Sequence, residues 1–196
     1  MMKTGLLGLL FFVMLGMSAA QVPGRGECPD IQVQPNFKKE KYVGTWYEYE
    51  RFFAAFELGG ICGQANYTAK PDGHIRVLNI GFNEWTKKVT SAEGDAYAPD
   101  PSVPAKLVVS FPGVPGPFAK GNYWVVSTDY DSYAVVWSCS AIDLKIIDLH
   151  GAIAWILTRK RGVLDEDRKT KIYDIFKSYD IDPSYFKKVE QDNCPN

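Results

Sequence analysis

The feature that most constrains this chain is a series of eight short segments rich in β-branched and aromatic residues, separated by turn residues. The segments are 45–50, 63–69, 74–80, 89–97, 106–111, 123–128, 133–138 and 153–158. Pro71-Asp72-Gly73 separates the second from the third and predicts a hairpin. The pattern predicts an all-β, antiparallel fold, either a sandwich or a barrel, rather than a parallel α/β sheet.

One amphipathic helix is predicted after the strands. Ile172, Ile175, Phe176 and Tyr179 recur at helical spacing behind the acidic start 165–167, which suits the positive end of a helix dipole. Pro183 lies beyond the expected end of the helix. A single helix of this kind must cover one face of the sheet with its apolar stripe.

The first 20 residues are predicted to be a cleavable signal peptide. Lys3, the apolar run 6–14 and the small residues 18–20 have the charge, length and cleavage chemistry of such a segment. The apolar run is too short to span a bilayer. The remaining residues, 21–196, fit one domain, and the protein is predicted to be secreted.

Cysteine usage agrees with an extracellular protein. Cys28, Cys62, Cys139 and Cys194 all follow the predicted signal peptide, and none has the C-x-x-C spacing of a zinc site. An even number in an oxidising compartment favours two disulfides, for which spacing alone leaves three connectivities open. Residues 21–38 are predicted to be an irregular arm held by its cysteine.

Charge and histidine content disfavour several kinds of partner. The formal net charge is −1 and the charges are interspersed, so no basic stripe indicates nucleic acid binding. His74 and His150 are far apart in the sequence and are interpreted as turn or surface residues rather than metal ligands. No metal or other cofactor is predicted.

The alternating faces of the predicted strands suggest either an ordinary core or a cavity. Ala65 and Tyr67 share one face of their strand, Val77 and Asn79 share a face of the next, and Leu107, Val109 and Phe111 share another. The faces mix small, aromatic and amide side chains, which is typical of the wall of a small-molecule site. Alternation alone leaves both interpretations open.

Three motifs, taken in order, resemble the conserved blocks of the lipocalin family: Gly44-Thr45-Trp46-Tyr47, Thr128-Asp129-Tyr130 and Arg159. Further segments resemble the apolipoprotein D group of that family, namely 64–67, 104–107, 123–124, 133–135, 154–157 and 193–195. The resemblance covers essentially the whole chain after the signal peptide. It implies an eight-stranded antiparallel up-and-down β-barrel with one C-terminal α-helix packed on the outside.

The resemblance also assigns structural roles. It implies that Trp46 closes the narrow end of the barrel, with the Arg159 guanidinium across its indole and further donors on backbone carbonyls. Gly44, Thr128, Asp129 and Tyr130 belong to the same structural motifs, and Asp129 and Tyr130 are interpreted as turn and cap residues. It further implies disulfides joining Cys28 to Cys139 and Cys62 to Cys194.

Alternation and the resemblance together predict an inward, ligand-binding face for a small hydrophobic molecule such as a fatty acid, steroid, retinoid or bilin-like chromophore. Asn79 and Tyr67 would supply hydrogen-bond donors, and Trp155 a flat wall. The predicted ligand-binding residues are Ala65, Tyr67, Val77, Asn79, Val109, Phe111, Tyr123, Val136, Ile153, Trp155 and Leu157.

The predicted function is a noncatalytic carrier, with a biliverdin- or carotenoid-binding coloration protein as the alternative. A lipid-isomerising or lipid-peroxide-reducing enzyme is disfavoured, because both disulfides consume the cysteines and all four methionines lie in the signal peptide. Asn66 begins the only N-x-S/T sequon and is a predicted outward-facing glycosylation site. The proline-rich segment 111–118 is either a rigid loop or a weak contact with a membrane or lipoprotein.

Overall fold

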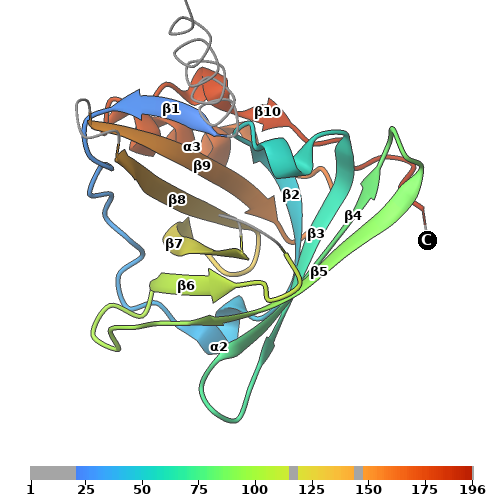
Figure 1. Cartoon of the computed structure of the whole chain (residues 1–196), viewed down its shortest axis with the longest axis horizontal. Helices are drawn as coiled ribbons and strands as arrows, with labels where there is room; N and C mark the ends of the chain where they lie inside the picture. Colours follow the sequence, from blue (N-terminus) through green and yellow to red (C-terminus); the bar gives the residue numbers. More distant parts are fainter. Residues whose placement is uncertain (1–20, 115–118, 144–147, 196) are drawn as a thin grey trace, which may run out of the picture.

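The chain forms a closed antiparallel β-barrel in a computed structural model that describes residues 21–114, 119–143 and 148–195 (Figure 1). Each barrel strand pairs with the next along the chain, and β9 pairs back with β2. Closure pairs the first and last barrel strands with each other over part of their length. The predicted up-and-down barrel is confirmed. Its strands are β2 (Gly44–Arg51), β3 (Gly60–Ala69), β4 (Ile75–Asn83), β5 (Lys88–Tyr97), β6 (Lys106–Ser110), β7 (Lys120–Thr128), β8 (Tyr133–Asp143) and β9 (Asp148–Thr158).

Two short strands are added to the barrel, and one of them corrects the prediction of an irregular N-terminal arm. β1 (Val22–Arg25) pairs with β9, with Val22 opposite Ala152. β2 pairs with β9 only from Trp155 onward, so the first part of β9 has a backbone edge that β1 can occupy. β10 (Lys187–Lys188) pairs with the end of β2.

The prediction that His150 is a turn or surface residue is wrong. His150 lies on β9, is 9% exposed, and its Nδ1 is 3.1 Å from the carbonyl oxygen of Gly26. A side chain at Gly24 would collide with its ring, so the glycine allows β1 to lie close to β9. His74 is partly exposed beside a turn, as expected, with its Nδ1 2.6 Å from Asp95 Oδ2.

The predicted C-terminal helix is confirmed as α3 (Glu166–Lys177), which packs on the outside of the barrel. The Asp165 side chain caps it by accepting a hydrogen bond from the backbone N–H of Arg168 at 2.9 Å. Ile172 and Phe176 are fully buried, and the Phe176 ring lies 6.0 Å from that of Trp137 on β8.

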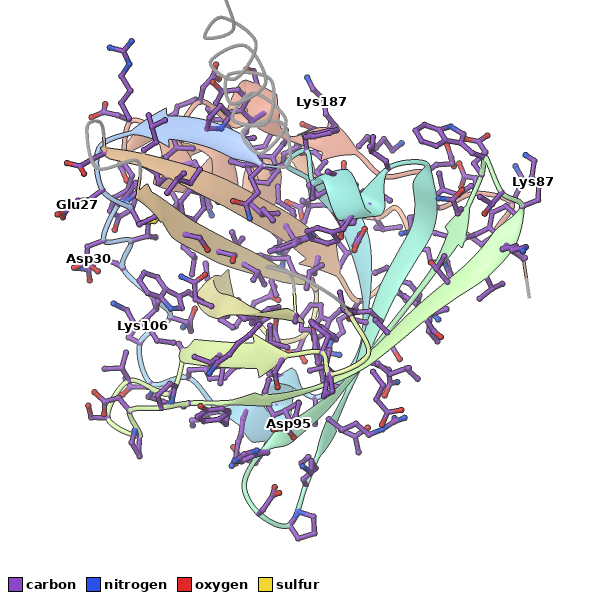
Figure 2. All side chains as sticks on the ribbon, in the orientation of Figure 1. Glu27, Asp30, Lys87, Asp95, Lys106 and Lys187 are labelled. Carbon is purple, nitrogen blue, oxygen red and sulfur yellow. A yellow bond between two sulfur atoms is a disulfide. The ribbon has the colours of Figure 1, made fainter. Side chains whose placement is uncertain are left out.

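The connections at the two ends of the barrel contain short helices. α2 (Lys39–Tyr42) precedes β2 at one end, and η1 (Ala55–Glu57) follows β2 at the other (Figure 1). η3 (Pro183–Tyr185) lies in the C-terminal tail. Charged side chains such as Glu27, Lys87 and Lys187 lie on the outside of the molecule (Figure 2).

Trp46 and Arg159 close the α2 end of the barrel. The Trp46 ring is fully buried, and the Arg159 guanidinium carbon lies 3.7 Å from the ring centroid. Arg159 also donates hydrogen bonds to several backbone carbonyls, including that of Thr45 at 2.9 Å and that of Val43 at 3.0 Å. Gly44 has φ +99°, and a Cβ there would lie 3.1 Å from Arg159 Nη1. Through these contacts the Arg159 guanidinium joins Trp46 to the backbone at the closed end of the barrel.

The second lipocalin-like motif forms a tight turn between β7 and β8. Thr128 Oγ1 accepts a hydrogen bond from the Tyr130 N–H at 2.9 Å. The Asp129 carboxylate accepts from the N–H groups of Ser132 and Tyr133, at 2.8 and 3.0 Å. The Tyr130 carbonyl accepts from Arg159 Nε at 2.9 Å, which links this turn to the closed end.

Two disulfides join the arm and the tail to the barrel, with the connectivity that the resemblance implied. Cys28 is bonded to Cys139 on β8, and Cys62 on β3 to Cys194. The N–H of Cys62 also donates to the Glu190 carbonyl at 2.7 Å, so the tail is held at more than one point.

Candidate functional site

The barrel encloses a cavity of about 190 Å³ whose wall contains most of the residues predicted to face inward. Val77 lines a narrower, deeper space that shares five wall residues with this cavity. Val136 is fully buried in the barrel core with Trp46 and is not part of the described cavity wall. The predicted residues in the main wall are Ala65, Tyr67, Asn79, Val109, Phe111, Tyr123, Ile153, Trp155 and Leu157.

Strand register explains why alternation predicted this face. Ala65 lies opposite Asn79, and Tyr67 lies opposite Val77, in the pairing of β3 with β4. Directly opposed residues of two neighbouring strands point to the same face of the sheet. The barrel has one inside face. Once the inward residues of one strand pair are known, the residues that face inward on the neighbouring strands follow from the pairing.

Three tyrosines form a hydrogen-bonded chain at the deep end of the cavity. The Tyr123 hydroxyl is 2.8 Å from the hydroxyls of both Tyr42 and Tyr67. Burial raises the pKa of all three phenols, so they remain neutral at physiological pH. Three hydroxyls carry three protons, and two hydrogen bonds use two of them. One O–H is left to donate into the cavity, where the Asn79 amide also lies.

A polar cluster at the other end of the cavity was not predicted. It consists of Glu48 and Arg51 on β2, Glu57 on η1 and Trp155 on β9. Arg51 Nη1 donates to Glu48 Oε2 at 2.5 Å, and Arg51 Nε lies 3.1 Å from Glu57 Oε2. Trp155 Nε1 donates to Glu57 Oε1 at 3.2 Å. Both glutamates and Trp155 line the cavity.

The inward position of Glu48 could have been predicted from the sequence, whereas that of Glu57 could not. Glu48 is two residues after Trp46 on the same strand, so alternation places both side chains inside the barrel. Glu57 lies in the loop after β2, where no periodic pattern exists. Tyr42 was missed for the same reason, because it lies on α2.

Burial and the neighbouring Glu48 raise the pKa of Glu57 to about 8, against the opposing effect of Arg51. An unfolded glutamate has a pKa of about 4.3, so between these values folding takes up a proton. The contribution of Glu57 to the free energy of unfolding therefore falls as pH rises through this range and is constant above it.

Replacing Glu57 with glutamine is consequently expected to stabilise the protein at pH 8 by about 1–3 kcal/mol, because it removes a buried carboxylate. At pH 4 the gain should vanish. Urea denaturation at both pH values measures the difference, with Glu84→Gln on the exposed β4–β5 turn as the matched control. An equal effect of Glu57→Gln at both pH values would contradict the assignment.

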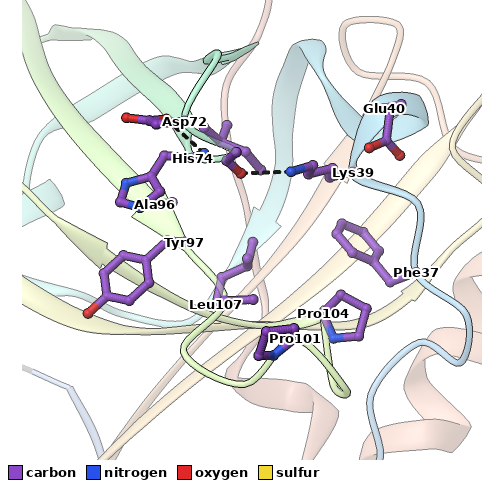
Figure 3. Close-up of a pocket in the computed structure, with 13 residues that line it drawn as sticks. Phe37, Lys39, Glu40, Asp72, His74, Ala96, Tyr97, Pro101, Pro104 and Leu107 are labelled. Carbon is purple, nitrogen blue, oxygen red and sulfur yellow. Dashed lines mark hydrogen bonds between the residues drawn. The ribbon is translucent and has the colours of Figure 1, made fainter.

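A larger hollow, of about 440 Å³, lies at the α2 end (Figure 3). Its apolar surface includes Phe37 and Leu107, and its rim carries Lys39, Asp72 and His74. Lys39 Nζ donates to the Gly73 carbonyl at 2.7 Å, which connects α2 to the β3–β4 turn. The tyrosine-lined space separates this hollow from the main cavity, so the two are distinct sites.

Comparison with known proteins identifies the family. A family model described as a lipocalin-like domain matches residues 37–191. The chain belongs to the lipocalin family. This lipocalin is 39% identical to apolipoprotein D of Cavia porcellus over 96% of the chain and 97% of the relative. It is 33% identical to the Lazarillo protein of Schistocerca americana over 97% of the chain and 87% of the relative.

Solved structures agree with the lipocalin barrel. Insecticyanin from the tobacco hornworm Manduca sexta superposes with a TM-score of 0.71 at 26% identity, over 87% of this chain and 89% of that one. Lobster apocrustacyanin A1 superposes with a TM-score of 0.73 at 22% identity, over 88% and 93%.

Of the remaining predicted features, the structure describes the sequon and only part of the proline-rich loop. Asn66 lies on the outer side of β3 and is partly exposed, with its Nδ2 donating to Thr45 Oγ1 at 3.0 Å. The signal-peptide prediction and residues 115–118 of the proline-rich loop lie outside the described residues. Among the described residues, no helix has the length and apolarity to cross a membrane, and no three His, Cys, Asp or Glu side chains are grouped to hold a metal ion.

Proposed function

We propose that this lipocalin is a secreted, noncatalytic carrier that binds a small hydrophobic molecule inside its barrel. The observation that carries the proposal is the composition of the cavity wall. Aliphatic and aromatic side chains such as Val109, Phe111 and Leu157 form much of it, with groups of polar side chains among them. A concave site whose surface is mostly apolar, with polar groups placed among the apolar ones, suits a steroid, retinoid, fatty acid or bilin-like ligand.

The deep end of the cavity favours a ligand with a hydrogen-bond acceptor. The tyrosine chain has one O–H to donate, and the Asn79 amide adds N–H donors beside it. A carbonyl oxygen can accept from these groups without bringing a charge into a buried site. We therefore expect the carbonyl end of a ligand to enter first.

Secretion and glycosylation are part of this proposal. Two disulfides with no free cysteine suit an oxidising compartment. The partly exposed Asn66 suits N-glycosylation on the outside of β3. Because all four cysteines are bonded, thiol chemistry of the kind a lipid-isomerising enzyme would need has no residue to perform it.

A weak contact with a membrane or lipoprotein through 111–118 is also proposed. The described part of this segment, which includes Phe111 and Val114, borders the cavity. Exposed apolar residues near the η1 end support a lipid contact there, since Leu58 is 44% and Trp85 69% exposed. A ligand could then pass between the lipid phase and the cavity.

Pigment carriage is the second candidate function. Insecticyanin and apocrustacyanin have the same fold, and Trp155, Phe111 and Tyr123 supply flat aromatic walls that suit a conjugated molecule. Visible absorbance of the protein purified from its source would distinguish a pigment carrier from a carrier of colourless lipid. Native mass spectrometry with extraction of the bound molecule would identify either ligand.

Trp155 is expected to report ligand binding by fluorescence. Arachidonate, progesterone, retinol and biliverdin should be titrated into the parent and into Trp155→Phe. The variant should lose most of the ligand-dependent signal, while competition or calorimetry shows binding weakened by only about 1–2 kcal/mol, because phenylalanine retains much of the apolar wall. Trp85→Phe, at an exposed tryptophan, is the control. Absence of micromolar binding for all four ligands would refute the carrier proposal.

A further inference from the structure

Two carboxylate oxygens of the polar cluster at the η1 end, one on Glu48 and one on Glu57, accept no hydrogen bond from the described residues. Glu48 Oε2 accepts from Arg51, and Glu57 Oε1 accepts from Trp155. Glu57 Oε2 is buried without a hydrogen bond of good geometry, although Arg51 Nε is 3.1 Å away. Glu48 Oε1 has no hydrogen-bond partner among the described residues. An ionised carboxylate offers about four acceptor sites and no donor, so this end of the cavity lacks donors when Glu57 is ionised.

The backbone occupies part of the Arg51 guanidinium, which limits the donors that Arg51 offers to the carboxylates. Its Nη2 donates to the Glu57 carbonyl at 3.1 Å and to the Gly60 carbonyl at 2.8 Å. These bonds hold Arg51 against the β2–β3 connection. The side chains of Arg51, Glu48 and Glu57 are only 14%, 18% and 18% exposed, so water has limited access to the carboxylates.

A positively charged residue elsewhere in the cavity wall, Lys120, does not supply a donor to these carboxylates. Lys120 at the start of β7 also lines the cavity, but its side chain is exposed and forms none of the observed ion pairs in the described part of the chain. A solvated lysine at a rim attracts a carboxylate only weakly. The acceptors of the cluster are the better-enclosed polar groups.

The cluster and the tyrosine chain border different parts of the cavity, and Glu48 lies near enough to Tyr67 to help raise the pKa of its phenol. Tyr42 comes from α2, just before β2, and Glu57 comes from η1, just after it (Figure 1). β2 runs the length of the barrel between them. A ligand that fills the cavity therefore has one end near spare donors and the other near spare acceptors.

We infer that the cavity selects hydrophobic ligands that carry a carbonyl at the end seated against Tyr67 and Tyr123 and a hydroxyl or N–H at the end seated against Glu48 and Glu57. This inference rests on the proposed carrier function and specifies its ligand class. The donor of the ligand would bond Glu48 Oε1, the acceptor that the protein leaves unused. A ligand with acceptors at both ends would leave the carboxylates without a donor and would bind less tightly.

Protonation of Glu57 supports a test by pH. Burial and Glu48 raise the pKa of Glu57 to about 8. The charged groups around Glu57 are Glu48 and Arg51 on β2, with Lys120 on β7 across the cavity, and its neutral neighbour on β9 is Trp155. Near pH 6.5 Glu57 is mostly protonated and carries an O–H of its own. Above pH 8 Glu57 is mostly ionised and can only accept hydrogen bonds, so the preference for a ligand with a donor should increase.

Testosterone and androstenedione form a matched pair for this test. Both have the same ring-A carbonyl, and at position 17 testosterone has a hydroxyl where androstenedione has a second carbonyl. Binding to the parent protein should be measured by calorimetry at pH 6.5 and pH 9. Testosterone is expected to bind roughly tenfold more tightly at pH 9, the scale of one hydrogen bond to a charged group, and by a smaller factor at pH 6.5.

Single substitutions test whether the preference for testosterone depends on the two glutamates. Glu48→Gln and Glu57→Gln should reduce the preference below about threefold, while the exposed Glu84→Gln should leave it unchanged. Tyr123→Phe should weaken both steroids to the same extent, because both present a carbonyl to the deep end. Circular dichroism and thermal melts would show that each variant is folded.

Equal affinity of the two steroids for the parent at both pH values, or tighter binding of androstenedione, would overturn the inference and leave the carrier function standing. A preference for testosterone that survives in both glutamate variants would also overturn it. If neither steroid binds and arachidonate, retinol and biliverdin also fail, both the inference and the carrier proposal are refuted.

Discussion

Trp46→Ala is expected to lower the free energy of unfolding by about 3–5 kcal/mol, the usual cost of truncating a buried tryptophan. The ring is 0% exposed, and its Nε1 donates to the Tyr42 carbonyl at 2.8 Å. Its centroid lies 5.3 Å from that of Tyr42 and 3.7 Å from the Arg159 guanidinium carbon. Alanine would leave a cavity and a guanidinium without its aromatic partner.

Urea denaturation followed by circular dichroism measures this loss. Trp85→Ala is the matched control, since Trp85 is 69% exposed, and its truncation should cost less than about 1 kcal/mol. If Trp46→Ala unfolded at the same urea concentration as the parent, Trp46 would not close a packed barrel end. Because the ligand cavity lies beyond the tyrosine chain, a folded Trp46→Ala fraction should still bind ligand at low temperature.

Replacing both Cys62 and Cys194 with alanine is expected to cost roughly 2–5 kcal/mol, because the bridge closes a long loop and so restricts the unfolded chain. The two cysteines are separated by 132 residues. In the folded protein the Gln191 side chain still donates to the carbonyls of Glu48 and Gly63, both at 2.8 Å. The tail should therefore stay docked in the native state while the melting temperature falls.

Thermal melts with and without a reducing agent check this prediction. Reduction should destabilise the parent more than the double variant, which retains only the Cys28–Cys139 bridge. Peptide mapping of the unreduced parent should recover the same two pairs. An unchanged melting temperature for the double variant would show that the tail contacts alone hold this part of the fold.

Local patterns account for the parts of the fold that were predicted correctly. Strand alternation depends on a period of two that every strand shows by itself, so the residues on one face of each strand could be grouped without knowing their neighbours. The resemblance to lipocalins then identified the face with Tyr67, Val109 and Trp155 as the inward one. The same holds for α3, where Ile172 and Phe176 recur at helical spacing.

The incorrect or missing predictions concern residues whose surroundings come from distant parts of the chain. β1 forms because the edge of β9 is available, and His150 is buried because β1 then lies over it. Nothing within residues 21–38 or around position 150 specifies either event. A histidine inside a strand does not by itself indicate whether another segment of the chain will cover its side chain.

By itself, the sequence determined the strands, the inward face, the helix and, through its resemblance to lipocalins, the closure by Trp46 and Arg159. Only the tertiary structure decided the chemistry of the cavity ends. Closure of β9 on β2 brings Trp155 to Glu57 across 98 positions of sequence, and α2 brings Tyr42 to Tyr123. The protonation of Glu57 and the spare hydroxyl of the tyrosine chain depend on these long-range contacts, because burial and partner count are properties of the assembled barrel.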